Sequence, residues 1–182
     1  VRFVVAVPAS QNIYVEVADI NIKNVYQSAT FDFNEVTSGG IGTPWSSLST
    51  LANYSSGAKN GSNAISTSNP IQLTPVSNSV NVTTLQSGNN LMLLPQIPQA
   101  YWTPTSSQSV GSAAYVSVTY RMYYSTDGGS TKTWLMGGAS SFVTAGFPLA
   151  ATNGVTNALW EAGKIYTYTI TLGDGSGNSG GG

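Results

Sequence analysis

The chain has 182 residues, of which six are Lys or Arg and seven are Asp or Glu, giving a formal net charge of −1. So few charges exclude the positive field that attracts nucleic acid or an anionic membrane surface, and we expect no nucleic-acid partner. The length fits one sizeable domain, and a hydrophobic content of 41% separates the chain from disordered proteins, so we expect it to fold.

Cysteine and histidine are both absent. Thiolate metal sites, thiol nucleophiles and disulfides are excluded, and the commonest general base is missing. We therefore expect no enzyme activity, no metal and no cofactor. Residues 1–10 lack the basic region and cleavage site of a signal peptide, and no apolar run reaches membrane-spanning length. These features predict a soluble chain and are consistent with a processed or excised piece of a longer protein.

The first predicted strand is VRFVVAV, residues 1–7. The two-residue period of a strand places its large side chains on one face, and the opposite face is apolar too. Such a strand either completes its own sheet or pairs with the edge of another subunit, and the first arrangement is favoured. The candidate subunit-contact residues are Val1, Phe3, Val5 and Val7.

Residues 13–25 predict a strand whose apolar face changes phase between Val17 and Ile20. Alternation permits this change only if a β-bulge lies near Ala18 and Asp19. A short separate strand is predicted to follow at residues 29–33.

Residues 37–70 predict a long surface excursion, because 22 of these 34 residues are Ser, Thr, Asn or Gly. The segment is too polar for a core element and too long for an ordinary connection. A spacing of three residues between apolar side chains predicts one or two helical turns that attach it to the body. The residues with this spacing are Trp45, Leu48, Leu51 and Tyr54.

Residues 90–149 predict several further strands. Residues 90–96 (NLMLLPQ) predict a buried strand that Pro95 ends, and residues 114–124 are the clearest strand in the sequence. Asp127 and the two glycines after it predict a hairpin turn into residues 132–136. One or two short strands follow at residues 141–149.

Residues 164–172 (KIYTYTITL) alternate large side chains with threonines, which predicts a strand with one face in the core. Before it, Gly163 permits a left-handed turn, so Trp160 can fold back over one end of the core with its indole N–H hydrogen-bonded. Strands separated by turn signals, without a βαβ rhythm, predict an all-β, two-sheet β-sandwich of transthyretin-like or Greek-key type.

The acidic residues are candidates for chemistry, since glycoside hydrolysis needs two carboxylates facing one bond. Glu16, Asp19, Asp32 and Glu35 occupy positions typical of solvent-facing residues, so no catalytic pair is predicted. Asp127 is a turn residue rather than a calcium ligand, because its loop offers a single carboxylate.

Three aromatic residues are candidates for ligand contact, because flat rings on loops can stack on sugar rings. They are Trp45, Tyr101 and Trp102. The alternative is that these rings cap the ends of the sandwich, which is the more common place for tryptophan.

The order of these segments resembles the fimbrillin-like subunits of Bacteroidota surface fimbriae, the donor-strand-assembled type V pili. Residues 13–33 resemble the family's phase-shifted strand and short "gtf" strand, and residues 91–96 resemble its l-P-Q core strand. Residues 159–172 (LWEAGKIYTYTITL) are similar to its W-x-x-G-K-x-Y-x-Y closing strand. The resemblance covers residues 1–173 as one domain of the carboxy-terminal kind, followed by a Gly/Ser-rich tail or linker at 174–182. Family members also carry a lipoprotein signal and usually a second domain.

This resemblance implies a structural or adhesive subunit of a bacterial surface fimbria, located outside the cell and assembled by strand donation between subunits. The implied partners are other fimbrial subunits, with host or bacterial surface glycans or proteins as adhesion targets. The membrane is reached only through a lipid anchor on a precursor, at the outer membrane. Two alternatives stay open: a carbohydrate-binding surface module, and a phage or virion decoration domain.

Overall fold

The computed structural model describes residues 1–9, 11–33, 45–81, 91–98, 113–149 and 160–173. Within these ranges the chain forms strands, turns and bends but no helix, which confirms the all-β prediction. The same ranges accordingly contain no helix that is long and apolar enough to span a lipid bilayer.

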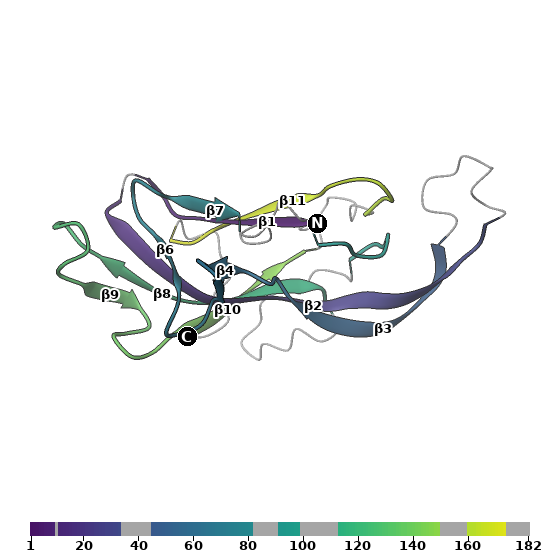
Figure 1. Cartoon of the computed structure of the whole chain (residues 1–182), viewed down its shortest axis with the longest axis horizontal. Coiled ribbons are helices and arrows are strands. Elements are labelled where there is room, and N and C mark those ends of the chain that lie inside the picture. Colours follow the sequence, from purple (N-terminus) through teal and green to yellow (C-terminus); the bar gives the residue numbers. More distant parts are fainter. Residues whose placement is uncertain (10, 34–44, 82–90, 99–112, 150–159, 174–182) are drawn as a thin grey trace.

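A three-stranded sheet contains the first strand at its centre (Figure 1). β1 (Arg2–Ala6) pairs in parallel with β11 (Thr167–Thr171) along its whole length, and in antiparallel orientation with β7 (Ser79–Asn81). Within the described residues, β7 and β11 are therefore the two edges of this sheet.

A larger sheet is built on two long central strands, β2 (Ile13–Phe31) and β8 (Tyr115–Tyr124), which pair antiparallel. β3 and β6 pair with β2, and β9 and β10 pair with β8. The bounds of these four strands are Trp45–Ser55 for β3, Ile71–Leu73 for β6, Thr133–Met136 for β9 and Val143–Pro148 for β10. A separate hairpin joins β4 (Lys59–Asn60) to β5 (Asn63–Ala64).

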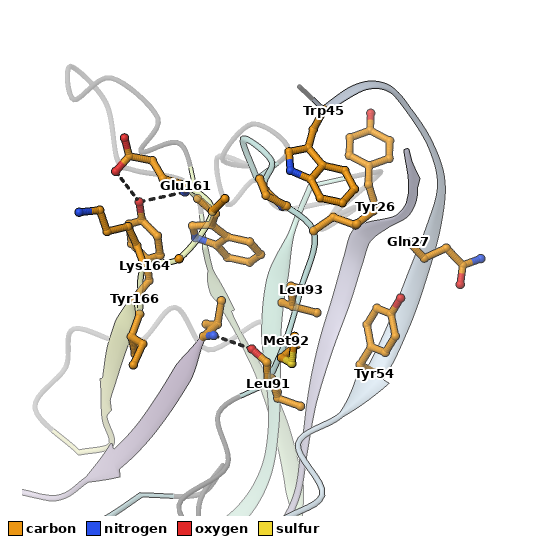
Figure 2. A pocket seen from close by; sticks show the side chains of 17 residues that line it. Tyr26, Gln27, Trp45, Tyr54, Leu91, Met92, Leu93, Glu161, Lys164 and Tyr166 are labelled. Atoms are coloured by element: carbon orange, nitrogen blue, oxygen red, sulfur yellow. Dashed lines mark hydrogen bonds between the residues drawn. The ribbon is translucent and has the colours of Figure 1, made fainter. Parts of the chain in front are cut away.

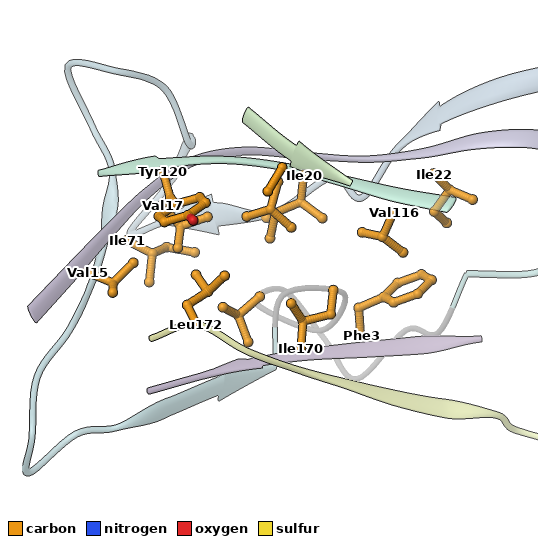
Figure 3. Close-up of a cluster of buried hydrophobic side chains, with 14 of the residues drawn as sticks. Phe3, Val15, Val17, Ile20, Ile22, Ile71, Val116, Tyr120, Ile170 and Leu172 are labelled. Atoms are coloured by element: carbon orange, nitrogen blue, oxygen red, sulfur yellow. The ribbon is translucent and has the colours of Figure 1, made fainter. Parts of the chain in front are cut away.

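The hydrophobic core lies between the two sheets. Figure 3 shows Phe3 and Ile170 of the smaller sheet, with Leu172 directly after β11, opposite Ile20 and Val116 of the larger sheet. All five side chains are buried, and each stabilises the fold by about 1.5–3 kcal/mol relative to an exposed position. The facing sheets therefore depend on apolar packing, as expected for a chain without disulfides.

The predicted bulge in β2 is confirmed, because its pairing with β8 shifts register between Val17 and Asp19. The extra residue changes which face the following side chains occupy. Val17 before the bulge and Ile20 after it consequently both point into the core and are fully buried.

Two other expectations for this region were wrong. Residues 29–33 do not form a separate strand, since β2 runs without a break to Phe31. The spacing of three in residues 45–54 marks no helical turn, because this stretch is β3, paired antiparallel with β2. Ser47 has a positive φ angle of 53° and lies where the β2–β3 register shifts, so one extra residue of β3 interrupts its two-residue period there.

The expectation of a buried strand at residues 90–96 was also wrong. Residues 91–94 are not in a strand, and Met92 is 96% exposed. Leu91 and Leu93 are partly buried against the edge of the core, and the whole run lines an open groove formed with neighbouring segments.

The predicted strands of the second half are confirmed in β8, β9, β10 and β11. The hairpin turn between β8 and β9 is organised by Asp127, whose carboxylate accepts hydrogen bonds from the hydroxyl of Ser125 and the N–H of Thr131. These hydrogen bonds lower the pKa of Asp127. Gly128 and Gly129 adopt positive φ angles of 74° and 94°, as the turn requires.

Glu16 corrects the expectation of a solvent-facing carboxylate. It is 5% exposed and pairs with two cations: Arg121 Nη2 at 2.5 Å and Lys132 Nζ at 2.9 Å. Arg121 also lies over the ring of Trp134, with 5.1 Å to the ring centre, and Lys132 lies over Tyr123 at 4.4 Å. This charged cluster connects β2, through Glu16, to Arg121 on the paired strand β8 and to Lys132 in the turn before β9.

The ionisation of Glu16 is linked to folding. Burial alone raises the pKa of Glu16, but the hydrogen bonds and charges of Lys132 and Arg121 outweigh burial and lower the pKa from its ordinary value of 4.5. Because the pKa is lower in the folded chain, the stabilisation is complete above the ordinary value and is lost as the pH falls through the folded-state value.

We predict that Glu16→Gln lowers the free energy of unfolding near neutral pH by about 3 kcal/mol, because it leaves two cations without their buried partner. The difference from the wild type shrinks as the pH falls below the ordinary glutamate pKa. Urea unfolding at several pH values measures both effects. Asp19→Asn, at an exposed carboxylate, is the control; an equal loss in both variants, or a loss independent of pH, contradicts the prediction.

Candidate functional site

An open cavity of about 650 Å³ lies at one end of the core, and we call it the aromatic groove. Its lining comes from three places: residues 26, 27, 45 and 54 of β2 and β3, residues 91–95, and residues 160–166, together with Val1. Figure 2 shows Tyr26 and Trp45 on one side, Lys164 and Tyr166 on the other, and Leu93 between them. Cavities of this size are typical of ligand sites in proteins.

One wall of the groove is an arm formed by residues 24–31 of β2 and 45–52 of β3. Pairing of β2 with β8 ends at Lys23, so the arm continues past the end of β8 (Figure 1). β2 therefore has β3 as its only strand partner along the arm within the described residues. At the end of the arm, Phe31 packs edge-on against Trp45, with ring centres 4.7 Å apart.

Gln96 connects the arm to the opposite wall. Its side-chain amide accepts a hydrogen bond from the N–H of Tyr26 at 2.8 Å and donates one to the carbonyl of Tyr26 at 3.1 Å. Its backbone N–H and carbonyl form a bridge with Trp160, at 3.2 and 2.8 Å. Gln96 is 1% exposed, so it forms hydrogen bonds to two separate segments within the interior.

The opposite wall begins at Trp160, whose ring is buried. Its indole N–H donates to the hydroxyl of Tyr168 at 2.7 Å, which confirms the predicted fold-back with a hydrogen-bonded indole. Burial raises the pKa of Tyr168, although the hydrogen bond from Trp160 opposes this rise. Gly163 has a positive φ of 74°, as predicted, and the turn is closed by the N–H of Glu161, which donates to the hydroxyl of Tyr166 at 3.0 Å.

Leu91 begins the floor of the groove and is held by the first residue of the chain. The amino nitrogen of Val1 donates to the carbonyl of Leu91 at 2.6 Å, and the N–H of Leu91 donates to the carbonyl of Val1 at 3.0 Å. Pairing at Leu91 and at Gln96 anchors both ends of residues 91–96. Between these anchors the side chain of Met92 remains in solvent.

The lining combines aromatic and apolar side chains with two charged ones. Its charged side chains are Glu161 and Lys164, and the hydroxyl of Tyr166 donates to the Glu161 carboxylate at 3.4 Å. Paired carboxylates do not occur in this lining. In the part of the chain that the structure describes, no group of three or more acidic residues could hold a metal ion. Met92 and Ile165, which is 60% exposed, present apolar surface to solvent at the groove.

The predicted site residues fall in different places. The structure buries all four residues of the first strand in the core of their own chain, the arrangement that the sequence favours: Val1, Phe3, Val5 and Val7. Trp45 lies on the groove wall. Tyr101 and Trp102, with Glu35, lie outside the described residues.

Sequence reasoning missed Tyr26, Tyr54, Met92 and Gln96 as parts of the site. Tyr26 and Tyr54 are aromatic residues in strands whose pairing partner was not recognised. Gln96 is a single glutamine after a proline, and no local pattern distinguishes it from an exposed glutamine. The apolar run at residues 91–94 was the available signal, but it was interpreted as core.

The chain was compared with known proteins by sequence and by structure. No family model matches the sequence, and neither a curated protein nor a solved structure matches the chain.

We predict that Gln96→Ala lowers the free energy of unfolding by about 3 kcal/mol, because it removes both hydrogen bonds to the half-buried backbone of Tyr26 and leaves a cavity in place of a fully buried side chain. Urea unfolding measures the change. Gln27→Ala is the control: Gln27 is the exposed glutamine next to Tyr26 in β2, and we expect a loss below about 1 kcal/mol. Equal losses in the two variants contradict this role of Gln96.

Proposed function

We propose that the chain is a structural and adhesive subunit of a bacterial surface fimbria, in which the aromatic groove accepts an extended segment of a neighbouring subunit. The observation that carries this proposal is the exposed apolar lining of the groove, above all Met92 and Ile165. Exposed apolar side chains at the rim of an open groove are typical of an interaction site.

Strand pairing is the mode of contact that fits the groove best. The edge of β2 that Gln96 contacts has no strand partner beyond Lys23 in the described residues, and the side chain of Gln96 occupies one position of the missing ladder. An incoming strand continues that ladder toward the end of the arm. Its backbone supplies hydrogen bonds, and alternate side chains enter the groove and set the register. Contacts of this head-to-tail kind propagate into a filament.

We also propose the type of β-sandwich and the bounds of the domain. Two facing sheets with a shared core support a sandwich of transthyretin-like or Greek-key type, in one domain over residues 1–173 of the carboxy-terminal fimbrillin kind, with 174–182 as a tail or linker. The scarcity of charge supports an extracellular location, with other fimbrial subunits as partners and a lipid anchor on a precursor as the route to the outer membrane.

We predict that Ile165→Asp weakens self-association of the full chain by about tenfold, because an incoming apolar segment must then desolvate a carboxylate. Analytical ultracentrifugation over a range of concentrations measures the association, and electron microscopy detects filaments. Leu135→Asp is the matched control, since Leu135 is 49% exposed but lies on β9 outside the groove. A wild-type chain that stays monomeric at every concentration contradicts the proposal, and so do equal effects of the two variants.

A second function, carbohydrate binding, is favoured by the position of Trp45 on the wall of an open cavity with Tyr26 and Tyr54. Aromatic faces of this kind accept sugar rings, and Gln27 and Glu161 offer hydrogen-bonding groups beside them. The phage or virion decoration alternative rests on composition alone.

We predict that saturable binding on a glycan array is lost in Trp45→Ala, because the variant removes the largest aromatic face of the groove wall. Binding is kept in Tyr124→Ala, at an exposed aromatic residue outside the groove lining. Absence of glycan binding by the wild type contradicts this second candidate.

A further inference from the structure

The sulfur atoms of this chain are confined to three methionines, because cysteine is absent. All three lie in described parts of the structure and differ sharply in exposure. Met92 is 96% exposed, Met122 is 9% exposed, and Met136 is partly buried against the core. An oxidant dissolved in the surrounding water therefore reaches one thioether far more easily than the other two.

We propose that Met92 is an oxidation site for hydroperoxides and that its oxidation controls occupancy of the aromatic groove. A lone pair of the Met92 sulfur attacks one peroxide oxygen, forming the S–O bond as the O–O bond breaks. The thioether is oxidised by two electrons to the sulfoxide. The peroxide is reduced by the same two electrons, and with one proton transferred to the departing oxygen it leaves as water or an alcohol.

The position of Met92 gives this modification a local effect. Its neighbours Leu91 and Leu93 line the same groove, and Figure 2 shows the three residues together between the two walls. A sulfoxide is polar and accepts hydrogen bonds, so an apolar segment that covers it must remove its water without replacing those hydrogen bonds. The consequence for assembly rests on the proposed function, whereas the oxidation site itself does not.

Oxidation of the exposed Met92 affects the groove without damaging the fold. The Met92 side chain is almost entirely in solvent, so its oxidation leaves the packing of the core unchanged. Met122, by contrast, belongs to the core cluster on β8. A sulfoxide at Met122 would place a polar group among apolar side chains and destabilise the native state. The two positions therefore form a natural comparison within one chain.

The first test asks whether peroxide oxidises Met92 in preference to the other two methionines. The native full chain is treated with hydrogen peroxide, and peptide mass spectrometry follows sulfoxide formation at each methionine over time. We expect Met92 to react at least about tenfold faster than Met122 and faster than Met136, and methionine sulfoxide reductases to reverse the change. In urea the three rates converge, which shows that folding causes the difference. Similar rates at Met92 and Met122 in the native chain overturn the proposal.

The second test is the effect on the groove. Anilinonaphthalene sulfonate, a dye that fluoresces on apolar surfaces, is titrated into the untreated and the oxidised chain, and the same comparison is made for Met92→Leu, which cannot be oxidised at this position. We expect oxidation to weaken dye binding several-fold in the wild type and to leave Met92→Leu unchanged. Equal dye binding before and after selective oxidation of the wild type overturns control of the groove.

Self-association measured on the same samples separates this inference from the proposed function. Loss of association on oxidation in the wild type, but not in Met92→Leu, supports both. If Met92 oxidises selectively and dye binding falls, yet the chain never self-associates in either state, the oxidation site stands and the proposed assembly through the groove fails.

Discussion

The paired hydrogen bonds between the Gln96 side chain and the backbone of Tyr26 are the interaction on which the candidate site depends. Pairing of β2 with β8 ends at Lys23, so the arm of β2 and β3 projects beyond the rest of the larger sheet. A two-stranded pair of this kind is only marginally stable without further support. Gln96 provides that support with a side-chain amide, which has the same donor and acceptor as a peptide group. Because its backbone also bridges to Trp160, the two walls of the groove are connected at its inner end and are open beyond it.

The two ends of the molecule thus differ in the interactions that hold them. At one end, Glu16 on β2 pairs with Arg121 on β8 and with Lys132 in the turn before β9, and the rings of Trp134 and Tyr123 lie against the two cations. At the other end, apolar side chains such as Ile165 remain in water, and the backbone edge of the arm has no strand partner among the described residues. In the proposed function, the groove end displays apolar surface and a strand edge to a partner, while the core between the two sheets supplies the stability.

Much of the fold was predictable, because it follows from alternation and turn chemistry. The bulge after Val17, the hairpin at Asp127 and the fold-back of Trp160 each follow from a local rule. The failures share a cause, since each depends on a partner distant in sequence. A serine-rich stretch becomes β3 because β2 offers it an edge, and Glu16 is buried because cations reach it from another strand and turn. Leu91 and its neighbours form no strand and line a groove at the edge of the core, because their backbone partners are Val1 and Trp160, far away in sequence.

Native-state hydrogen exchange of the Tyr26 amide, followed by NMR, tests the role of Gln96 most directly. If the Gln96 amide completes the end of the sheet, the Tyr26 N–H exchanges only when the whole fold opens, as slowly as the N–H of a core residue such as Val118. The side-chain amide protons of Gln96 are then protected as well. Exchange of the Tyr26 N–H at the rate of an exposed loop amide would show that the arm opens independently, and would contradict a groove whose two walls are joined through Gln96.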